Sequence, residues 1–205
     1  MPSLLAICVV SELHDDAGVV GTTAIDKRPQ DGAVKIGPYG AYADVQADRE
    51  NHGGLDAALY AYSNEDADWW AAELLERWGE RAPGELRPGW FGENLRVAGI
   101  DLSGARVGER WRIGVGDNAV ELEVTFPRRP CQTFARWVGA QYGTDLERGW
   151  VKRFQLAARP GTYLRVLRNG SIRAGDGIEV VSRPDDAPTI AEVFRDGELE
   201  RTIRK

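Results

Sequence analysis

The sequence predicts a mainly β protein, either a barrel or a sandwich, with a few peripheral helices. Short runs rich in Val, Ile, Leu and aromatic residues recur along the 205 residues, and Gly, Pro, Asp or Asn separate them. Many short strands joined by glycine-rich turns are typical of these two architectures. A hydrophobic content of 42% is ample for one core, and no repeat, low-complexity block or linker divides the chain.

Eight segments carry the strand pattern. They are Leu4–Val10, Gly18–Ile25, Ala33–Ile36, Asn94–Val97, Trp111–Val115, Val120–Phe126, Tyr163–Leu167 and Gly177–Val181. Between two of these segments lies Gly116-Asp117-Asn118. Because such residues favour tight turns, this triplet predicts a hairpin.

Three segments are predicted to be helical. Glu65–Trp78 places apolar residues near helical spacing, and Gly79 follows as a stop signal. Thr144 and Glu147 have the spacing of a capping box and predict a helix over Asp145–Ala158. Thr189 and Glu192 repeat that spacing in a short C-terminal helix, and the charged residues 196–205 after it are expected to fray into a tail.

The composition argues against several classes of partner. A net charge of -6 and a pI of about 5.1 give no general attraction to nucleic acid or to an anionic membrane. No stretch approaches the roughly 20 apolar residues needed to span a bilayer. The N-terminal apolar run has no basic leader and is not typical of a signal peptide. We therefore expect a soluble cytoplasmic protein.

The two cysteines stand in different contexts. Cys8 lies within an apolar strand-like run and is expected to be structural. Cys131 follows two arginines and two prolines, in Pro127-Arg128-Arg129-Pro130-Cys131, just beyond a predicted strand. Nearby positive charge favours the thiolate, which attacks electrophiles or binds metals, whereas the alternative is a small apolar residue packed in a core. A disulfide between the two is not expected, and so few cysteines fit a reducing compartment.

Five sequence blocks together resemble one protein family. They are His52-Gly53-Gly54-Leu55-Asp56-Ala57-Ala58-Leu59-Tyr60, Phe91-Gly92-Glu93-Asn94-Leu95, Arg128–Cys131, Pro160–Leu167 and Ile172–Asp176. In this order, across about residues 21–184, they resemble the MOSC-domain family, and within it the bacterial YiiM-like branch. The resemblance implies one MOSC domain over residues 1–205, a distorted β-barrel, with residues 185–205 as a C-terminal helix and tail.

The resemblance also implies a chemistry. MOSC domains are expected to hold a molybdopterin-type molybdenum cofactor, here with the sulfur of Cys131 as the protein ligand to molybdenum. Members of the branch are linked to reductive cleavage of N–OH bonds in compounds such as N-hydroxylated purines. The expected partners are therefore a small N-hydroxylated substrate and a separate electron-donor protein, because the chain contains no flavin motif or reductase domain. A homodimer is also possible, and no pyridoxal phosphate is expected.

The block that begins at His52 is a candidate wall of this site. Gly53 and Gly54 lack side chains, so the backbone can approach a ligand closely. His52 alone could either brace a loop or line a site, and the resemblance favours a site residue that takes part in catalysis. Asp56 and Tyr60 are expected on a helical turn after the loop, with structural roles.

Basic residues are candidates for binding an anion. In related proteins a Lys at the matching strand end lies near the terminal phosphate of the cofactor, which implies that role for Lys27. Arg128 or Arg129 could grip an anion with two hydrogen bonds. Because side chains alternate along an extended chain, only one of the two is expected to face the site. The alternation does not tell which one, and Arg129 is taken as the candidate.

The block after Phe91 contributes further candidates. Gly92 permits close backbone approach, and Asn94 could both donate and accept hydrogen bonds with a polar heterocycle. Glu93 is either a proton donor near the metal or a carboxylate paired with a neighbouring base. His14, in an acidic loop, is expected to be solvated, and the tryptophans, including Trp69, are expected in the core.

Two alternative functions use the same residues. One is a carrier that binds the cofactor without catalysis, or that relays sulfur as a persulfide on Cys131. The other is a metal-free enzyme in which His52 serves as the base for Cys131. The chain has no CxxC, HExxH, Walker or GxGxxG motif, and it has too few Cys and His residues for an ordinary zinc site.

Overall fold

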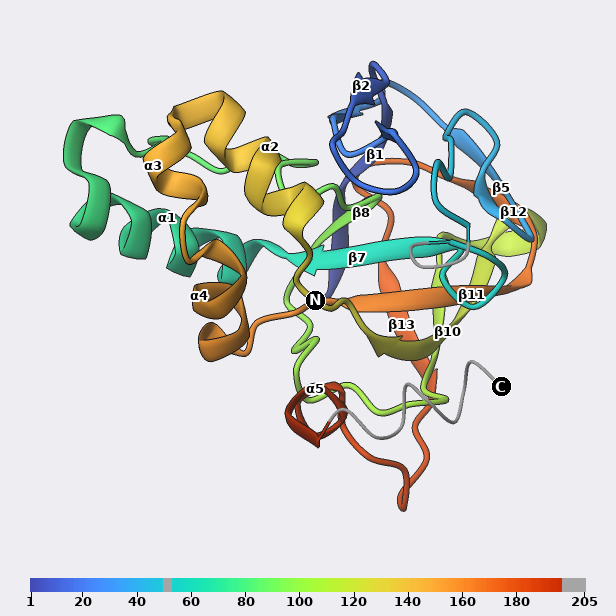
Figure 1. Cartoon of the computed structure of the whole chain (residues 1–205). Coiled ribbons are helices and arrows are strands. Elements are labelled where there is room, and N and C mark those ends of the chain that lie inside the picture. Colours follow the sequence, from blue (N-terminus) through green and yellow to red (C-terminus); the bar gives the residue numbers. More distant parts are fainter. Residues whose placement is uncertain (50–52, 197–205) are drawn as a thin grey trace.

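One curled, eight-stranded sheet organises the molecule (Figure 1). The computed structural model describes all residues except 50–52 and 197–205, and the side chains of 144 and 145. The strands of the sheet are β1 (Ser3–Val10), β4 (Lys27–Pro29), β7 (Leu59–Ser63), β8 (Leu95–Ala98), β9 (Arg110–Ile113), β10 (Val120–Pro127), β11 (Thr162–Arg168) and β13 (Ile178–Ser182). Their spatial order is β13-β9-β10-β11-β7-β8-β1-β4.

The edge strand β13 approaches β1, which is the neighbour of the other edge strand, β4. Neighbouring strands are antiparallel, except for the parallel pair β7 and β8. Ser3 forms a bridge with Gly177, and the Leu4 N–H donates to the Asp176 carbonyl at 2.9 Å, so the beginnings of β1 and β13 touch. The prediction of a mainly β protein is confirmed. The distorted barrel takes the form of a curled sheet in which β13 touches β1 through a single bridge, rather than a continuous closed ladder.

Two smaller sheets complete the β structure. One contains β12 (Gly170–Ile172), β5 (Val34–Gly37) and β6 (Gly40–Ala41), and the other pairs β2 (His14–Asp15) with β3 (Thr22–Thr23). The predicted strand over Gly18–Ile25 is wrong for most of its length. Gly21, at φ +76°, bends the chain there into the turn between β2 and β3.

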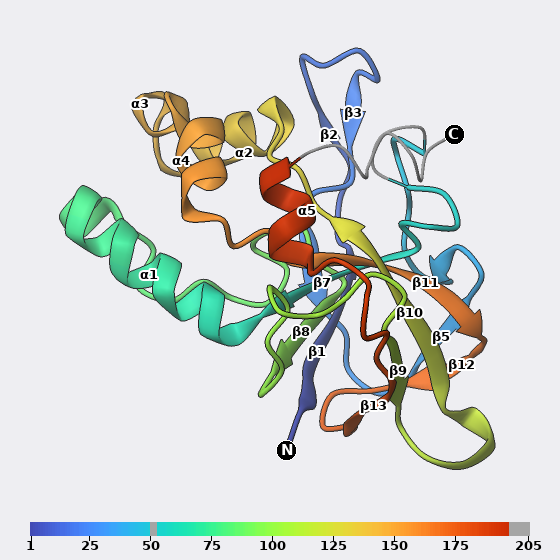
Figure 2. The ribbon, with the colours of Figure 1, turned by 90° about the horizontal axis from the view of Figure 1, so that it is seen from below.

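The helices α1 (Asn64–Trp78), α2 (Gln132–Tyr142), α3 (Thr144–Glu147) and α4 (Trp150–Ala157) lie together on one side of the sheet, as Figures 1 and 2 show. The short helix α5 (Ile190–Asp196) lies apart from them. The Thr189 hydroxyl accepts from the Glu192 N–H at 3.2 Å, which confirms the predicted capping box. The predicted helix over 145–158 is broken instead, because Gly149 adopts φ +77° before α4. None of the described helices is long and apolar enough to cross a membrane.

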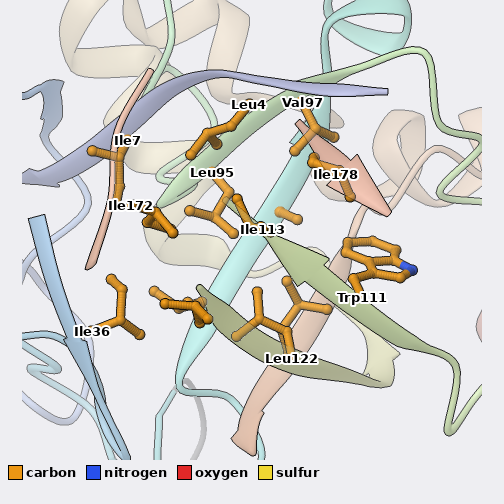
Figure 3. Close-up of a cluster of buried hydrophobic side chains, with 14 of the residues drawn as sticks. Leu4, Ile7, Ile36, Leu95, Val97, Trp111, Ile113, Leu122, Ile172 and Ile178 are labelled. Carbon is orange, nitrogen blue, oxygen red and sulfur yellow. The ribbon is translucent and has the colours of Figure 1, made fainter. Parts of the chain in front are cut away.

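Two apolar clusters hold these layers together. Aliphatic side chains such as Leu4, Ile113 and Leu122 fill the inside of the curled sheet (Figure 3). A second, aromatic cluster, which includes Trp70 and Trp150, packs the helices against the sheet. Trp69 was expected in the core but is 38% exposed. The predicted hairpin is confirmed, since a short 3₁₀ turn at Gly116–Asn118 joins the antiparallel strands β9 and β10.

Candidate functional site

A cavity of about 710 Å³ opens beside the β2–β3 hairpin, the loop of residues 44–49 and the start of α2. This volume lies in the range of roughly 300–1,000 Å³ that is typical of small-molecule and cofactor sites. Several predicted site residues from distant parts of the sequence line it: Lys27, Gly92, Asn94, Arg129 and Cys131. The fold therefore brings most of the predicted site into one place.

Cys131 occupies the junction between β10 and α2. It is the N-cap residue of α2, has an extended backbone at φ -131° and ψ 162°, and does not use its side chain to cap the helix. The thiol is half-buried and lines the cavity. The start of a helix carries partial positive charge, which stabilises an anionic sulfur. The sequence predicted the thiol beyond a strand end but missed the helix that follows it.

Arg128 is a buried cation in the wall of the cavity. It is 8% exposed, and its guanidinium carbon lies 4.9 Å from the ring centre of Tyr60 and 5.2 Å from that of Phe134. One N–H of the guanidinium donates to the Phe91 carbonyl. Burial is the largest influence on the Arg128 pKa and lowers it, but Tyr60, Tyr163 and Cys131 outweigh burial and raise the pKa. Among the described residues no carboxylate forms an ion pair with Arg128, so its charge is available to an anionic ligand.

Arg129 is engaged differently from its neighbour. Its Nη1 donates to the Phe194 carbonyl at 2.5 Å and its Nη2 to the Val193 carbonyl at 2.9 Å. The guanidinium also lies 5.1 Å from the ring centre of Phe194. Of the two arginines, Arg129 was taken as the candidate for binding an anion, and both arginines line the cavity. The contacts of Arg129 with α5 tie the Cys131 loop to the last turn of that helix, whose carbonyls have no partner within the helix.

Lys27 and Asn94 meet at a carboxylate that sequence reasoning missed. The Lys27 ammonium forms an ion pair with Asp44 Oδ2, and the Asn94 amide donates to the same oxygen at 2.7 Å. The Asn94 amide also donates to the Cys8 carbonyl at 3.1 Å and accepts from the Tyr60 N–H at 3.1 Å. Asn94 was expected to contact a heterocycle. In the structure its polar atoms bind other parts of the protein and pin β1, β7 and the 44–49 loop together.

Gly92 and Glu93, directly before Asn94, have structural roles in the turn that precedes β8. Gly92 has φ +75°, and a Cβ there would lie 3.1 Å from Ile25 Cγ1, so this position of the cavity wall favours glycine. Glu93 is fully buried, and its Oε1 accepts from Arg96 Nη2 at 2.5 Å and from the Gly89 N–H at 2.7 Å. Of the two interpretations of Glu93, the pairing with a base is the one the structure shows.

The loop that begins at His52 lies partly outside the described residues, and His52 itself is among those not described. Gly54 has φ +85°, and its N–H donates to Gln46 Oε1 at 2.9 Å. A Cβ on Gly53 would lie 2.8 Å from the same oxygen. Gln46 lines the cavity and neither glycine does, so Gly53 and Gly54 contact the cavity wall through Gln46.

The expectation that Asp56 and Tyr60 share a helical turn is wrong for Tyr60. Tyr60 belongs to β7, lines the cavity and donates its hydroxyl to the Pro160 carbonyl at 2.7 Å. Asp56 accepts from Arg165 Nε at 2.7 Å. The apolar run Leu59–Ser63 is a central strand buried throughout its length, and such runs lack the alternation that marks a half-buried strand.

A second missed carboxylate fastens the β2–β3 hairpin over the cavity. Asp16 accepts from Arg136 Nε and Nη2, both at 2.7 Å, and from the Thr133 hydroxyl at 2.9 Å. These hydrogen bonds, above all those from Arg136, lower the Asp16 pKa to about 2. Two residues before Asp16, His14 is half-buried rather than solvated, and its ring centre lies 4.9 Å from that of Trp137. The hairpin is therefore tied to the first turn of α2, directly after Cys131.

The described residues contain no cluster of three or more His, Cys, Asp or Glu side chains that could hold a metal ion. A metal that brings most of its own ligands and needs one soft sulfur donor is nevertheless suited to Cys131. The cavity also has the volume for a cofactor-sized molecule and a buried positive charge at Arg128. The donor set thus fits an anionic, metal-bearing cofactor.

Comparison with known proteins assigns the family. Residues 48–179 match the model of the MOSC domain. The chain is 35% identical over 161 residues to YflK of Bacillus subtilis, an alignment that covers 78% of this chain and 64% of YflK. It is 30% identical over 164 residues to YiiM of Escherichia coli, covering 80% of this chain and 66% of YiiM. The chain thus spans slightly less than two thirds of the length of these relatives.

A further relative and a solved structure extend the comparison. A protein of Gibberella moniliformis named Reductase is 30% identical over 177 residues, covering 85% of this chain but only 28% of that protein. The crystal structure of YiiM from Geobacillus stearothermophilus superposes with a TM-score of 0.71 at 25% identity, covering 98% of this chain and 86% of that one. The protein therefore belongs to the MOSC domain family, in its YiiM-like branch.

Proposed function

We propose that this protein binds a molybdenum cofactor of the molybdopterin type in the cavity and reduces N-hydroxylated compounds. One observation carries the proposal. Cys131 lines a cofactor-sized cavity from the N-cap position of α2, next to the buried cation Arg128, which forms no ion pair with a carboxylate among the described residues. In this proposal Cys131 is the protein ligand to molybdenum, and Arg128 binds the anionic end of the cofactor.

The proposed reaction consumes two electrons and two protons for each N–O bond that is broken. The hydroxylamino group becomes an amine, and the oxygen leaves as water. When bound, the cofactor supplies the two-electron redox chemistry, and a separate redox protein supplies the electrons. The chain contributes binding and orientation, because Cys131 is mounted at a strand end and the hairpin is fastened beside it by Asp16.

Three findings support the proposal, and one of them, the name of a relative, favours a redox enzyme over a carrier. The family match supports a MOSC protein, and one relative carries the name Reductase. The lining of the cavity joins a thiol to a buried cation, which suits an anionic cofactor. A carrier would use the same binding residues, so turnover distinguishes an enzyme from a carrier. A metal-free enzyme would need His52 as its base and would turn over substrate without molybdenum.

The test is expression in a host that makes the cofactor, followed by two measurements on the purified protein. Molybdenum and pterin should be present in equal and near-stoichiometric amounts. With a reduced viologen dye as the electron donor, the protein should convert a hydroxylaminopurine to the aminopurine. Bound cofactor without turnover of any hydroxylamino compound would indicate a carrier, and turnover without molybdenum would indicate the metal-free enzyme.

A further inference from the structure

The tip of the β2–β3 hairpin presents two valines at the mouth of the cavity. The Gly21 N–H donates to the Gly18 carbonyl at 3.0 Å, which makes Val19 and Val20 the central residues of a β-turn. Val19 is fully exposed, Val20 is 47% exposed, and both line the cavity. Gly, Asn, Asp, Pro and Ser dominate turn positions, so the turn itself does not account for two apolar β-branched side chains. Exceptions of this kind to a local rule are expected at functional sites.

The turn is mounted on a fixed carboxylate. Asp16 Oδ2, which accepts from Arg136 and Thr133 at the start of α2, also accepts from the Gly18 N–H at 3.1 Å. A Cβ on Gly18 would lie 2.7 Å from the same oxygen, so a side chain there would displace the carboxylate from Arg136. The turn is therefore connected, through Asp16, to the helix terminus that carries Cys131.

A third exposed valine lines the cavity from another segment. Val45 is 43% exposed and belongs to the 44–49 loop. The residue before it, Asp44, accepts from the Val10 N–H at 2.8 Å, which fixes the loop at this point. Scattered exposed apolar side chains need no explanation, but these three line one cavity from two anchored segments. We refer to Val19, Val20 and Val45 as the valine rim.

Other parts of the cavity lining are apolar as well. Ile25 and Ala58 are buried and line the same cavity. Two charged residues of the 44–49 loop that line it, Asp48 and Arg49, have opposite signs, so together they favour neither an anionic nor a cationic substrate. The cavity therefore joins the thiol of Cys131 to an apolar surface that includes an exposed rim.

We infer that the valine rim selects hydroxylamino substrates with an uncharged, apolar body and holds that body while the N–OH group lies toward Cys131. The inference rests on the proposed function for the N–OH group and adds the class of substrate, an aryl or alkylaryl hydroxylamine rather than a phosphorylated or sugar-bearing one. Burial of an apolar body against valine side chains stabilises the complex whatever the charge elsewhere in the cavity. The three valines are thus residues that determine specificity.

The test uses two arylhydroxylamines that carry a methyl or a butyl group opposite the hydroxylamino group. The ratio of kcat/KM for the butyl over the methyl compound is measured on protein with bound cofactor, and as a ratio it does not depend on how much of the protein is loaded. A fully buried methylene raises affinity about fourfold, and partial burial at an open rim should give about twofold. Since butyl has three more methylenes than methyl, the parent should prefer it by roughly eightfold.

Conservative variants isolate the apolar surface from the shape of the turn. The double variant Val19→Thr/Val20→Thr keeps both side chains β-branched but replaces a methyl group by a hydroxyl in each. Its preference for the butyl compound should fall to about twofold, and Val45→Thr should lower the preference to a smaller extent. Val115→Thr is the matched control, because Val115 is 90% exposed at the turn between β9 and β10 and is not part of the described cavity lining. It should keep the preference of the parent, and thermal melts establish that each variant is folded.

A second measurement needs no cofactor. Calorimetry of para-methylaniline and para-butylaniline with protein from a host that makes no molybdopterin should show the same loss of preference in the double variant. Equal kcat/KM for the two hydroxylamines in the parent, or a butyl preference that the double variant retains, would overturn the inference.

The inference would also be overturned by a parent dimer that the double variant converts to a monomer with the butyl preference unchanged, since the valines would then form an interface between two copies. Sedimentation of both proteins measures this. Failure of the proposed function is visible separately, as protein that contains no molybdenum and turns over neither hydroxylamine but still binds the anilines with the butyl preference.

Discussion

The two cysteines of this chain lie in regions that could hardly differ more. Cys8 sits in the middle of β1, completely buried, and burial raises its pKa to about 12. Cys131 sits at the start of α2, half-buried, in the wall of a cavity that also contains Arg128. Cys8 still serves the site indirectly, since its carbonyl accepts a hydrogen bond from Asn94. The surroundings, rather than the residue type, decide which thiol can do chemistry.

The largest contrast is expected in metal binding. Cys131→Ser should lose essentially all bound molybdenum, because a neutral hydroxyl is a poor substitute for a thiolate ligand. Its free energy of unfolding should change by no more than about 0.5 kcal/mol, since the position is half-buried and makes no helix-capping bond. Molybdenum analysis beside urea unfolding checks both parts. Full retention of molybdenum in Cys131→Ser would disprove the assignment of the ligand.

Reactivity toward a thiol reagent should differ almost as strongly. At pH 7 a thiol with a pKa of about 12, such as Cys8, is ionised in only about one molecule in 100,000, and burial blocks the reagent as well. Iodoacetamide should therefore modify Cys131 in the native protein at least about 100 times faster than Cys8. Mass spectrometry of timed samples gives both rates. Modification of both residues only after addition of denaturant would remove the contrast.

The effects on stability should be in the reverse order, with a larger loss for substitution of Cys8 than for substitution of Cys131. Cys8→Ser places a hydroxyl in a fully buried, apolar strand and should lower the free energy of unfolding by about 1–3 kcal/mol. Cys8→Ala, which adds no polar group, is the matched control and should cost less than Cys8→Ser. Molybdenum content should stay at the parent level in both variants. Equal losses from the two substitutions would show that lost packing, rather than polarity, governs this position.

The smallest effect is expected for Asp16, which accepts hydrogen bonds from Arg136 and Thr133 beside Cys131. Asp16 contributes stability above its ordinary pKa of 3.8, and this contribution disappears as the pH falls toward the folded-state pKa of about 2. The difference in unfolding free energy between the parent and Asp16→Asn should therefore be constant near neutral pH and shrink between about pH 4 and pH 2. Asp15→Asn, at the exposed neighbouring position, should give a curve parallel to the parent. A difference between the parent and Asp16→Asn that does not change with pH would mean that the carboxylate charge is not what holds the hairpin.

Local patterns predicted most of the strands, because the alternation of residues and the turn residues around them are local signals. These local patterns failed where packing against distant segments determines the secondary structure. The run Leu59–Ser63 is buried on both faces, so it shows no alternation and was not predicted as a strand, and its Tyr60 was placed on a helical turn. Helix α2 follows Pro130 and Cys131 without a side-chain cap, although the buried Phe134, Ala135 and Val138 have helical spacing that could have revealed it.

The candidate site could be predicted only in part for a similar reason. Sequence blocks located Cys131 and Gly92, and the family resemblance located Lys27; all three line one cavity. The carboxylates Asp44 and Asp16 were missed, because their partners lie far away along the chain and no motif marks either residue. Alternation along an extended chain predicted that one arginine of the adjacent pair faces the site but not which one, whereas the structure shows both in the cavity wall and what each guanidinium contacts.

X-ray absorption at the molybdenum edge tests the central claim most directly. The parent protein with bound cofactor should show one more sulfur ligand to molybdenum than the dithiolene of the cofactor supplies, and this ligand should come from Cys131. Any molybdenum retained by Cys131→Ser should lack that sulfur, whereas Cys8→Ser should give the spectrum of the parent. A parent spectrum without the additional sulfur, or an unchanged spectrum in Cys131→Ser, would contradict the assignment of Cys131 as the metal ligand.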